Sequence, residues 1–148
     1  MTQKAKEITK EDWRHLGFFY STITEEKKWV LTGSPYGLKA FILILNAYVK
    51  DPTNKSEGEH IHIGPYGYLK VETRKERSID KNRITGNSSD INELSKLIEK
   101  ELIDINIGKR IKVGLQYIKN ISYDLELDIR EYGFDPATMD SQLWINES

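Results

Sequence analysis

EGEHIHIGPYGYLKVET, residues 57–73, is the stretch that decides the fold, because it encodes two short strands and the turn that joins them. Residues 60–63 and 68–71 alternate between polar and apolar side chains, which is the pattern of a half-buried strand. Between them, GPYG at residues 64–67 supplies the glycine and proline conformations of a tight reversal. The stretch therefore predicts a β-hairpin that directs four side chains toward a core: Ile61, Ile63, Leu69 and Val71.

The segment before this hairpin predicts an arm and two strands. Residues 1–12 (MTQKAKEITKED) are polar, and we expect them to form a mobile arm. Residues 13–24 (WRHLGFFYSTIT) are rich in aromatic and β-branched types, which favour a strand. A charged turn then leads to a second strand at residues 29–32, which we expect to pair antiparallel with the first.

Two helices are expected, one on each side of the hairpin. Ser34 and Pro35 form a common helix opening, because the serine hydroxyl accepts from a free amide and proline has no amide to satisfy. The first helix then runs to about Lys50, and residues 51–54 end it. The second helix is marked by apolar residues at helical spacing: Ile91, Leu94, Leu97, Ile98 and Leu102.

The two halves of the chain resemble each other. Three pairs of segments align: 31–33 with 84–86, 60–64 with 110–114, and 69–71 with 125–127. Both halves, residues 13–73 and 83–130, therefore read as strand, helix, strand, strand, and residues 131–148 form a tail. Two such units predict an α+β protein with one domain over residues 1–148, a two-layer α/β sandwich whose helices cover one face of a largely antiparallel sheet.

Composition narrows the function classes. The 22 basic and 23 acidic residues nearly cancel, so we expect no nucleic-acid binding, which normally needs a basic excess. The chain has no cysteine, which excludes disulfides, thiolate zinc sites and cysteine nucleophiles, and we expect a cytoplasmic location. No secretory signal is apparent, and the longest apolar run, residues 40–45, is far shorter than the roughly 20 residues that span a bilayer. We therefore expect no association with a membrane.

The histidines of the hairpin are the best metal candidates. His60 and His62 are two residues apart on one strand, so both imidazoles point the same way and could bind zinc, copper or iron. Glu57 or Glu59 could add a carboxylate, but a catalytic site needs about three protein ligands and His15 is the only other histidine. We therefore predict no metal, no cofactor and no catalytic residue. A metal-binding protein or metal-dependent enzyme that uses His60 and His62 remains an alternative.

The open face of the predicted sheet is where we look for function. In the second half this face would carry the acidic side chains of Asp124, Glu126 and Asp128, which alternate away from the core. Carboxylates that alternate on an exposed strand are usually solvated. The chain contains no phosphate-binding glycine loop and no nucleophile elbow, so catalysis has no support in its motifs.

A resemblance to a known class of proteins adds a function. WVLTGSPYGLKAFILILNAYV, residues 29–49, followed by EHIHIGPYGYLKVE, residues 59–72, looks like the small α/β immunity proteins of bacterial polymorphic toxin and contact-dependent inhibition systems. In those proteins a strand-Gly-Ser/Asn-x-x-Gly-Leu-helix segment precedes a strand that contains histidine. The match covers residues 29–72, with a weaker echo at residues 83–129. The resemblance implies a protein that binds a cognate toxin domain and blocks its active site or substrate approach, without chemistry of its own.

We therefore expect a non-enzymatic inhibitor. Its sheet face and hairpin tip would contact the toxin through eight residues: Glu57, Glu59, His60, His62, Tyr66, Asp124, Glu126 and Asp128. An acidic strand could meet a basic nuclease cleft, which would speed encounter. A further alternative is a structural subunit that forms a homodimer through exposed strand edges. In the tail, Phe134 and Trp144 either cover an edge of the fold or present anchors to a partner.

Overall fold

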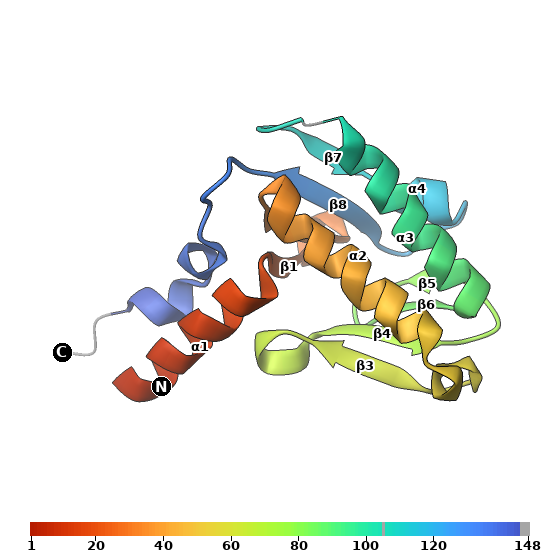
Figure 1. The fold of residues 1–148 in the computed structure, drawn as a ribbon, viewed down its shortest axis with the longest axis horizontal. Helices are drawn as coiled ribbons and strands as arrows, with labels where there is room; N and C mark the ends of the chain where they lie inside the picture. The colour runs from red at the N-terminus through yellow and green to blue at the C-terminus, as the bar shows by residue number, and fades with distance from the viewer. Residues whose placement is uncertain (105, 146–148) are drawn as a thin grey trace.

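The computed structural model describes residues 1–104 and 106–145, and it has the α+β class expected from the sequence (Figure 1). Within these residues the strands form two mixed sheets of four strands each. The first sheet contains, in spatial order, β1 (Phe19–Ile23), β2 (Lys28–Gly33), β8 (Asp124–Ile129) and β7 (Arg110–Lys112). The second sheet contains β3 (His60–Ile63), β4 (Leu69–Thr73), β6 (Ile84–Gly86) and β5 (Ser78–Ile79). The pairing is largely antiparallel, as expected, but two sheets replace the single expected one.

The similarity of the two halves accounts for this division. The first half contributes one hairpin to each sheet, and the β5–β6 and β7–β8 hairpins complete the two sheets, so an earlier hairpin lies beside a later one in each. Strand β5 precedes the predicted second half and was not expected from the sequence. The registers are equivalent, because Leu31 of β2 pairs with Leu127 of β8 as Ile84 of β6 pairs with Val71 of β4, both in parallel. These four positions are the ones that the sequence alignment made equivalent. In both sheets, a strand of one half therefore pairs in parallel with a strand of the other half, in equivalent register.

The two central helices begin as the sequence predicts. The Ser34 hydroxyl accepts a hydrogen bond of 3.0 Å from the amide of Gly37, and Pro35 is the first residue of α2 (Pro35–Lys50). Asn87 and Asp90 cap α3 (Ser88–Ile103) reciprocally, through bonds of 2.8 and 2.9 Å between each side chain and the other residue's amide. Each such cap stabilises a helix by about 1 kcal/mol. Local sequence therefore sets where these helices start.

The core lies between these helices and the strands. Figure 1 shows α2 and α3 side by side in front of the sheets. Phe41 and Leu45 of α2 and Leu94 and Ile98 of α3 are completely buried. Burying a side chain of this size contributes about 1.5–3 kcal/mol, so this contact is a main source of stability. Among the described residues, no helix is long and apolar enough to cross a membrane.

The N-terminal residues form a helix, α1 (Gln3–Leu16), so neither the mobile arm expected at residues 1–12 nor a strand starting at Trp13 is found there. The Thr2 side chain caps its first turn, and Gly17 ends it with a φ of 95°. The helix packs against two 3₁₀ turns near the C-terminus, η4 (Pro136–Met139) and η5 (Ser141–Trp144). Burial of Trp13 against this distant segment overrides its preference for a strand.

The η4 segment of the tail packs against α1 and against the edge strand β1, as the edge-covering alternative expects, while Trp144 stays 50% exposed. The Lys10 ammonium lies 4.1 Å from the ring centre of Trp144, and the Trp144 indole donates to the carbonyl of Ala137 at 3.0 Å. Where α1 ends, the chain also approaches α2 closely, because a Cβ at Gly37 would lie 2.1 Å from the carbonyl oxygen of Gly17. Only glycine fits at this position without a backbone shift. Helix α1 therefore packs on the η4–η5 segment on one side and approaches α2 where it ends.

Candidate functional site: an aromatic pocket

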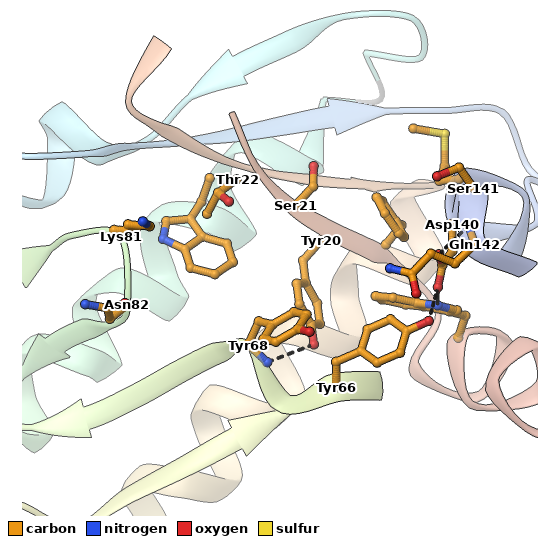
Figure 2. Close-up of a pocket in the computed structure, with 14 residues that line it drawn as sticks. Tyr20, Ser21, Thr22, Tyr66, Tyr68, Lys81, Asn82, Asp140, Ser141 and Gln142 are labelled. Carbon is orange, nitrogen blue, oxygen red and sulfur yellow. Dashed lines mark hydrogen bonds between the residues drawn. The ribbon is translucent and has the colours of Figure 1, made fainter. Parts of the chain in front are cut away.

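A pocket of about 460 Å³ opens where the first sheet, the β3–β4 turn and the C-terminal segment meet (Figure 2). Six aromatic side chains line it, and we call the cavity that they form the aromatic pocket: Trp13, Phe19, Tyr20, Trp29, Tyr66 and Tyr68. Figure 2 shows Asp140 and Gln142 at one end of the pocket and Lys81 and Asn82 at the other. The pocket therefore combines aromatic walls with ends of opposite charge.

Tyr66 reaches the pocket because the β3–β4 turn holds its backbone in a left-handed conformation. The turn is the 3₁₀ segment η3 (Pro65–Gly67), in which Tyr66 has a φ of 67°. For a residue with a Cβ this conformation costs about 1–2 kcal/mol, so other contacts must hold it. One of them is the hydrogen bond of 2.6 Å that the Tyr66 hydroxyl donates to Oδ2 of Asp140. Burial and this carboxylate raise the pKa of Tyr66, so its hydroxyl keeps its proton.

Asp140 is a buried carboxylate at the end of the pocket. It is 5% exposed and accepts hydrogen bonds from the Trp13 indole at 2.9 Å, from Tyr66, and from the amide of Gln142 at 3.2 Å. All three donors are neutral, and no lysine or arginine of the described chain forms an ion pair with Asp140. The pocket therefore contains a negative charge that neutral donors hold in place but do not neutralise.

Hydrogen bonds also fix the walls of the pocket. The buried Tyr20 hydroxyl donates to the carbonyl of Pro65 and accepts from the amide of Tyr68 at 3.3 Å, which ties the β3–β4 turn to β1. Burial raises the pKa of Tyr20, so this donor is protonated at neutral pH. The Trp29 indole donates to the carbonyl of Asp80 at 2.8 Å, which anchors the β5–β6 turn. The pocket is thus built in advance of any ligand.

Tyr66 and Tyr68 form its exposed rim. Their rings stack with centres 5.5 Å apart, and the side chains remain 40% and 66% exposed. The equivalent connection in the second half is the short helix α4 (Gly114–Tyr117), where Tyr117 is buried and its hydroxyl donates to the carbonyl of Thr85 at 2.7 Å. The two halves therefore differ here, because one connection exposes tyrosines where the other buries one.

The other residues predicted in the first half lie outside the pocket. Glu57, Glu59, His60 and His62 are exposed on β3 and the loop before it, and Tyr66 is the one predicted residue that lines the pocket. The two imidazole rings meet edge to face with centres 5.2 Å apart. Each Nδ1 lies within hydrogen-bond distance of a backbone carbonyl, at 3.0 Å for His60 and 2.9 Å for His62. Within the described residues, no group of three or more histidines and carboxylates could hold a metal ion.

The predicted acidic strand differs from expectation. Glu126 and Asp128 are buried, so their expected exposure on an open face is wrong. Basic side chains cover them: the Lys28 ammonium of the neighbouring strand β2 lies 2.7 Å from Glu126, and the guanidinium of Arg130, the residue after β8, lies 3.0 Å from Asp128. Asp124 is half-buried and accepts from the amide of Gly114 at 3.1 Å. Glu126 and Asp128 are therefore paired with basic side chains of this protein, whereas Asp124, within the described chain, accepts only from backbone amides.

Most of the pocket was not predicted. Its lining comes from segments far apart in sequence, since Trp13 and Asp140 are separated by 127 positions. The signal available was the dense aromatic content of residues 13–29, which the prediction assigned only to strands. A second surface was also missed, a groove of about 1210 Å³ beside α2. We call it the α2 groove, and four exposed apolar residues line it: Tyr36, Leu43, Ile103 and Tyr132.

Comparisons with protein-family models, curated proteins and solved structures give no match. The class that the structure defines is an α+β protein with a preformed aromatic surface pocket.

Proposed function

We propose that this protein is a non-enzymatic immunity protein, which binds a cognate bacterial toxin domain and blocks its active site or substrate approach. The observation that carries this proposal is the rim of the aromatic pocket, where Tyr66 and Tyr68 are stacked and exposed on a turn that hydrogen bonds hold in place. Tyrosine and tryptophan dominate the energetic centres of protein interfaces. A rigid pair of tyrosines loses little conformational freedom on binding, which favours such a contact.

Exposed polar residues along β3 and the loop before it would form the outer part of this interface. His60 and His62 are exposed on β3 of the hairpin that carries Tyr66, and Glu57 and Glu59 are exposed in the loop that leads into β3. Exposed charges at the edge of an interface mainly change the association rate and its dependence on salt. Asp124, Glu126 and Asp128 are left out of the proposed contact, because they lie in the other sheet, partly or wholly buried among their own partners.

The first experiment is a pull-down of the tagged protein from its native cells, with mass spectrometry of the bound chains and elemental analysis of the same sample. If the protein is an immunity protein, we expect a toxin-like chain to co-purify with it in a stoichiometric amount, without a transition metal. About one equivalent of metal and no partner would instead favour the alternative that uses His60 and His62.

The second experiment tests the surface. In cells that express the captured toxin domain, Tyr66→Ala combined with Tyr68→Ala should abolish protection. In calorimetry each substitution should weaken binding by about 2 kcal/mol, or roughly 30-fold, which is typical of an interface hot spot. Tyr36→Ala and Tyr132→Ala remove exposed tyrosines of the α2 groove and serve as matched controls. Full protection by the double variant would contradict the proposed contact.

The α2 groove favours a second candidate function, a subunit that forms a homodimer. It carries Lys39 and Glu99, which form no ion pair within the described chain, beside exposed Leu43 and Ile103. A two-fold axis could bring each lysine opposite the partner's glutamate, as a self-complementary interface requires. Sedimentation equilibrium tests this, since a dimer should become monomeric with Leu43→Lys. A monomer at all concentrations would reject it.

A further inference from the structure

We propose that the aromatic pocket binds a basic side chain, an arginine, which the partner protein inserts beside Tyr66 so that its guanidinium meets Asp140. This inference rests on the proposed function, because the arginine is assigned to a protein partner. The charge, the walls and the rim of the pocket all favour a guanidinium group.

The charge of the pocket favours a cation. Asp140 is buried, yet its hydrogen bonds come from the Trp13 indole, the Tyr66 hydroxyl and the amide of Gln142, and none of these donors carries a charge. A buried carboxylate is usually paired with a cation, and a carboxylate can accept about four hydrogen bonds. The Asp140 carboxylate therefore has room for one more hydrogen bond, and its negative charge has no cationic partner among the three donors. A cationic donor that enters the pocket could supply both.

The walls suit a guanidinium group. Trp13 and Tyr66 place aromatic rings beside the carboxylate, since both donate hydrogen bonds to it, and the Tyr20 ring packs against Trp13 with centres 5.1 Å apart. A cation over an aromatic face is attracted by the ring. Arginine is preferred to lysine at such sites, because its planar group stacks on rings and donates to carboxylates. An anion would be repelled by Asp140. The pocket therefore selects against phosphate groups and acidic side chains at this end.

The chain uses the same combination elsewhere. The Arg77 guanidinium lies 4.9 Å from the ring centre of Tyr117 and donates to Asp90 at 2.9 Å. There the aromatic ring, the carboxylate and the arginine all belong to this protein. In the aromatic pocket the ring and the carboxylate are present, while no arginine of the described chain lines the cavity.

The other end of the pocket gives the direction of entry. Lys81 lies at the end opposite Asp140 in Figure 2, and it is the only other charged side chain that lines the pocket among the described residues. Its ammonium would repel a guanidinium, so the cation is directed toward Asp140. The aliphatic stem of the arginine then passes over the exposed rings of Tyr66 and Tyr68.

The test uses a small probe in place of the partner. N-acetyl-L-arginine amide is titrated into the full-length protein, and the indole N–H signals of Trp13 and Trp29 are followed by NMR, since both rings line the pocket. N-acetyl-L-citrulline amide has nearly the same shape without the charge and is the matched control. We expect saturable shifts with the arginine probe and binding about tenfold weaker with citrulline, because both the ring and the carboxylate attract only the charged group.

A variant locates the interaction. Asp140→Asn should weaken binding of the arginine probe to the level of citrulline, and circular dichroism shows whether this variant folds. If the variant does not fold, the difference in affinity between the arginine and citrulline probes on the unaltered protein still tests the inference. Equal binding of arginine and citrulline, or no saturable shift, overturns the inference. A toxin captured without arginine binding refutes this inference alone, while arginine binding with no protein partner refutes the proposed function alone.

Discussion

The buried carboxylate of Glu72 should make the stability of the protein sensitive to acid. The variant Glu72→Gln measures how much free energy of unfolding this carboxylate contributes. Glu72 lies on β4 with its side chain 4% exposed, and three basic groups surround it: Lys70 at 2.9 Å, Arg83 at 3.0 Å and Arg74 at 2.5 Å. Burial alone would raise the pKa of Glu72, but hydrogen bonds from these three groups outweigh it and lower the pKa from 4.5 to about 2.

The size of the effect follows from this shift. A difference of about 2.5 pKa units at 1.36 kcal/mol each gives about 3 kcal/mol as an upper value. The basic partners are 21–45% exposed, so solvent screens them, and we expect about 2 kcal/mol. Because the pKa is lower in the folded state, this stability is fully present above about pH 4.5 and is lost as the pH falls toward about 2.

Urea unfolding, followed by tryptophan fluorescence at several pH values between 7 and 2, measures the effect. At pH 7 Glu72→Gln should lower the free energy of unfolding by about 2 kcal/mol, and the difference from the parent protein should shrink as the pH approaches 2. The exposed Glu57→Gln is the matched control and should change stability by less than about 0.5 kcal/mol. A difference between Glu72→Gln and the parent that stays constant from pH 7 to pH 2 would refute the reasoning.

Three further predictions concern packing. Gly37→Ala should lower the free energy of unfolding by about 2–3 kcal/mol, because the added Cβ would lie 2.1 Å from the Gly17 carbonyl oxygen; an unchanged thermal midpoint would contradict this close approach. Leu94→Ala should cost about 2–5 kcal/mol in urea unfolding, because it leaves a cavity beneath α3, and a loss below about 1 kcal/mol would mean that the core is looser than described. Trp13→Phe removes one donor from the buried Asp140 and should cost about 1–3 kcal/mol in the same assay, whereas equal stability would argue against this hydrogen bond.

The elements that sequence reasoning identified correctly are those with a strong local signal. The β3–β4 hairpin followed from alternation around GPYG, and α2 and α3 followed from their caps and apolar spacing. Helix α1 was missed because its sequence is mostly polar, and its burial depends on η4 and η5, more than 100 residues later. The local preference of Trp13 for a strand was overridden, because tertiary packing of α1 determines the structure of that region.

The candidate site was predicted only at one point. Tyr66 was named because it sits at the tip of a predicted turn, while Trp13 and Asp140 could not be connected with it by any local rule. For the acidic residues of β8, the prediction of an exposed binding surface was wrong, because Glu126 and Asp128 are buried. Alternation placed Glu126 and Asp128 on the outer face, but it could not indicate that Lys28, Arg110 and Arg130 would bury them there.

The sequence by itself determined the α+β class, the β1–β2, β3–β4 and β7–β8 hairpins, the two central helices and the equivalence of the two halves, because each depends on residues close together in the chain. Only the tertiary structure decided that the halves exchange hairpins to form two sheets. It also decided that Trp13 and residues 139–142 meet beside Tyr66 to build the pocket. Parallel strand pairing and a pocket built from distant segments arise from contacts between residues far apart in the chain, and periodicity along the sequence carries no information about which distant segments meet.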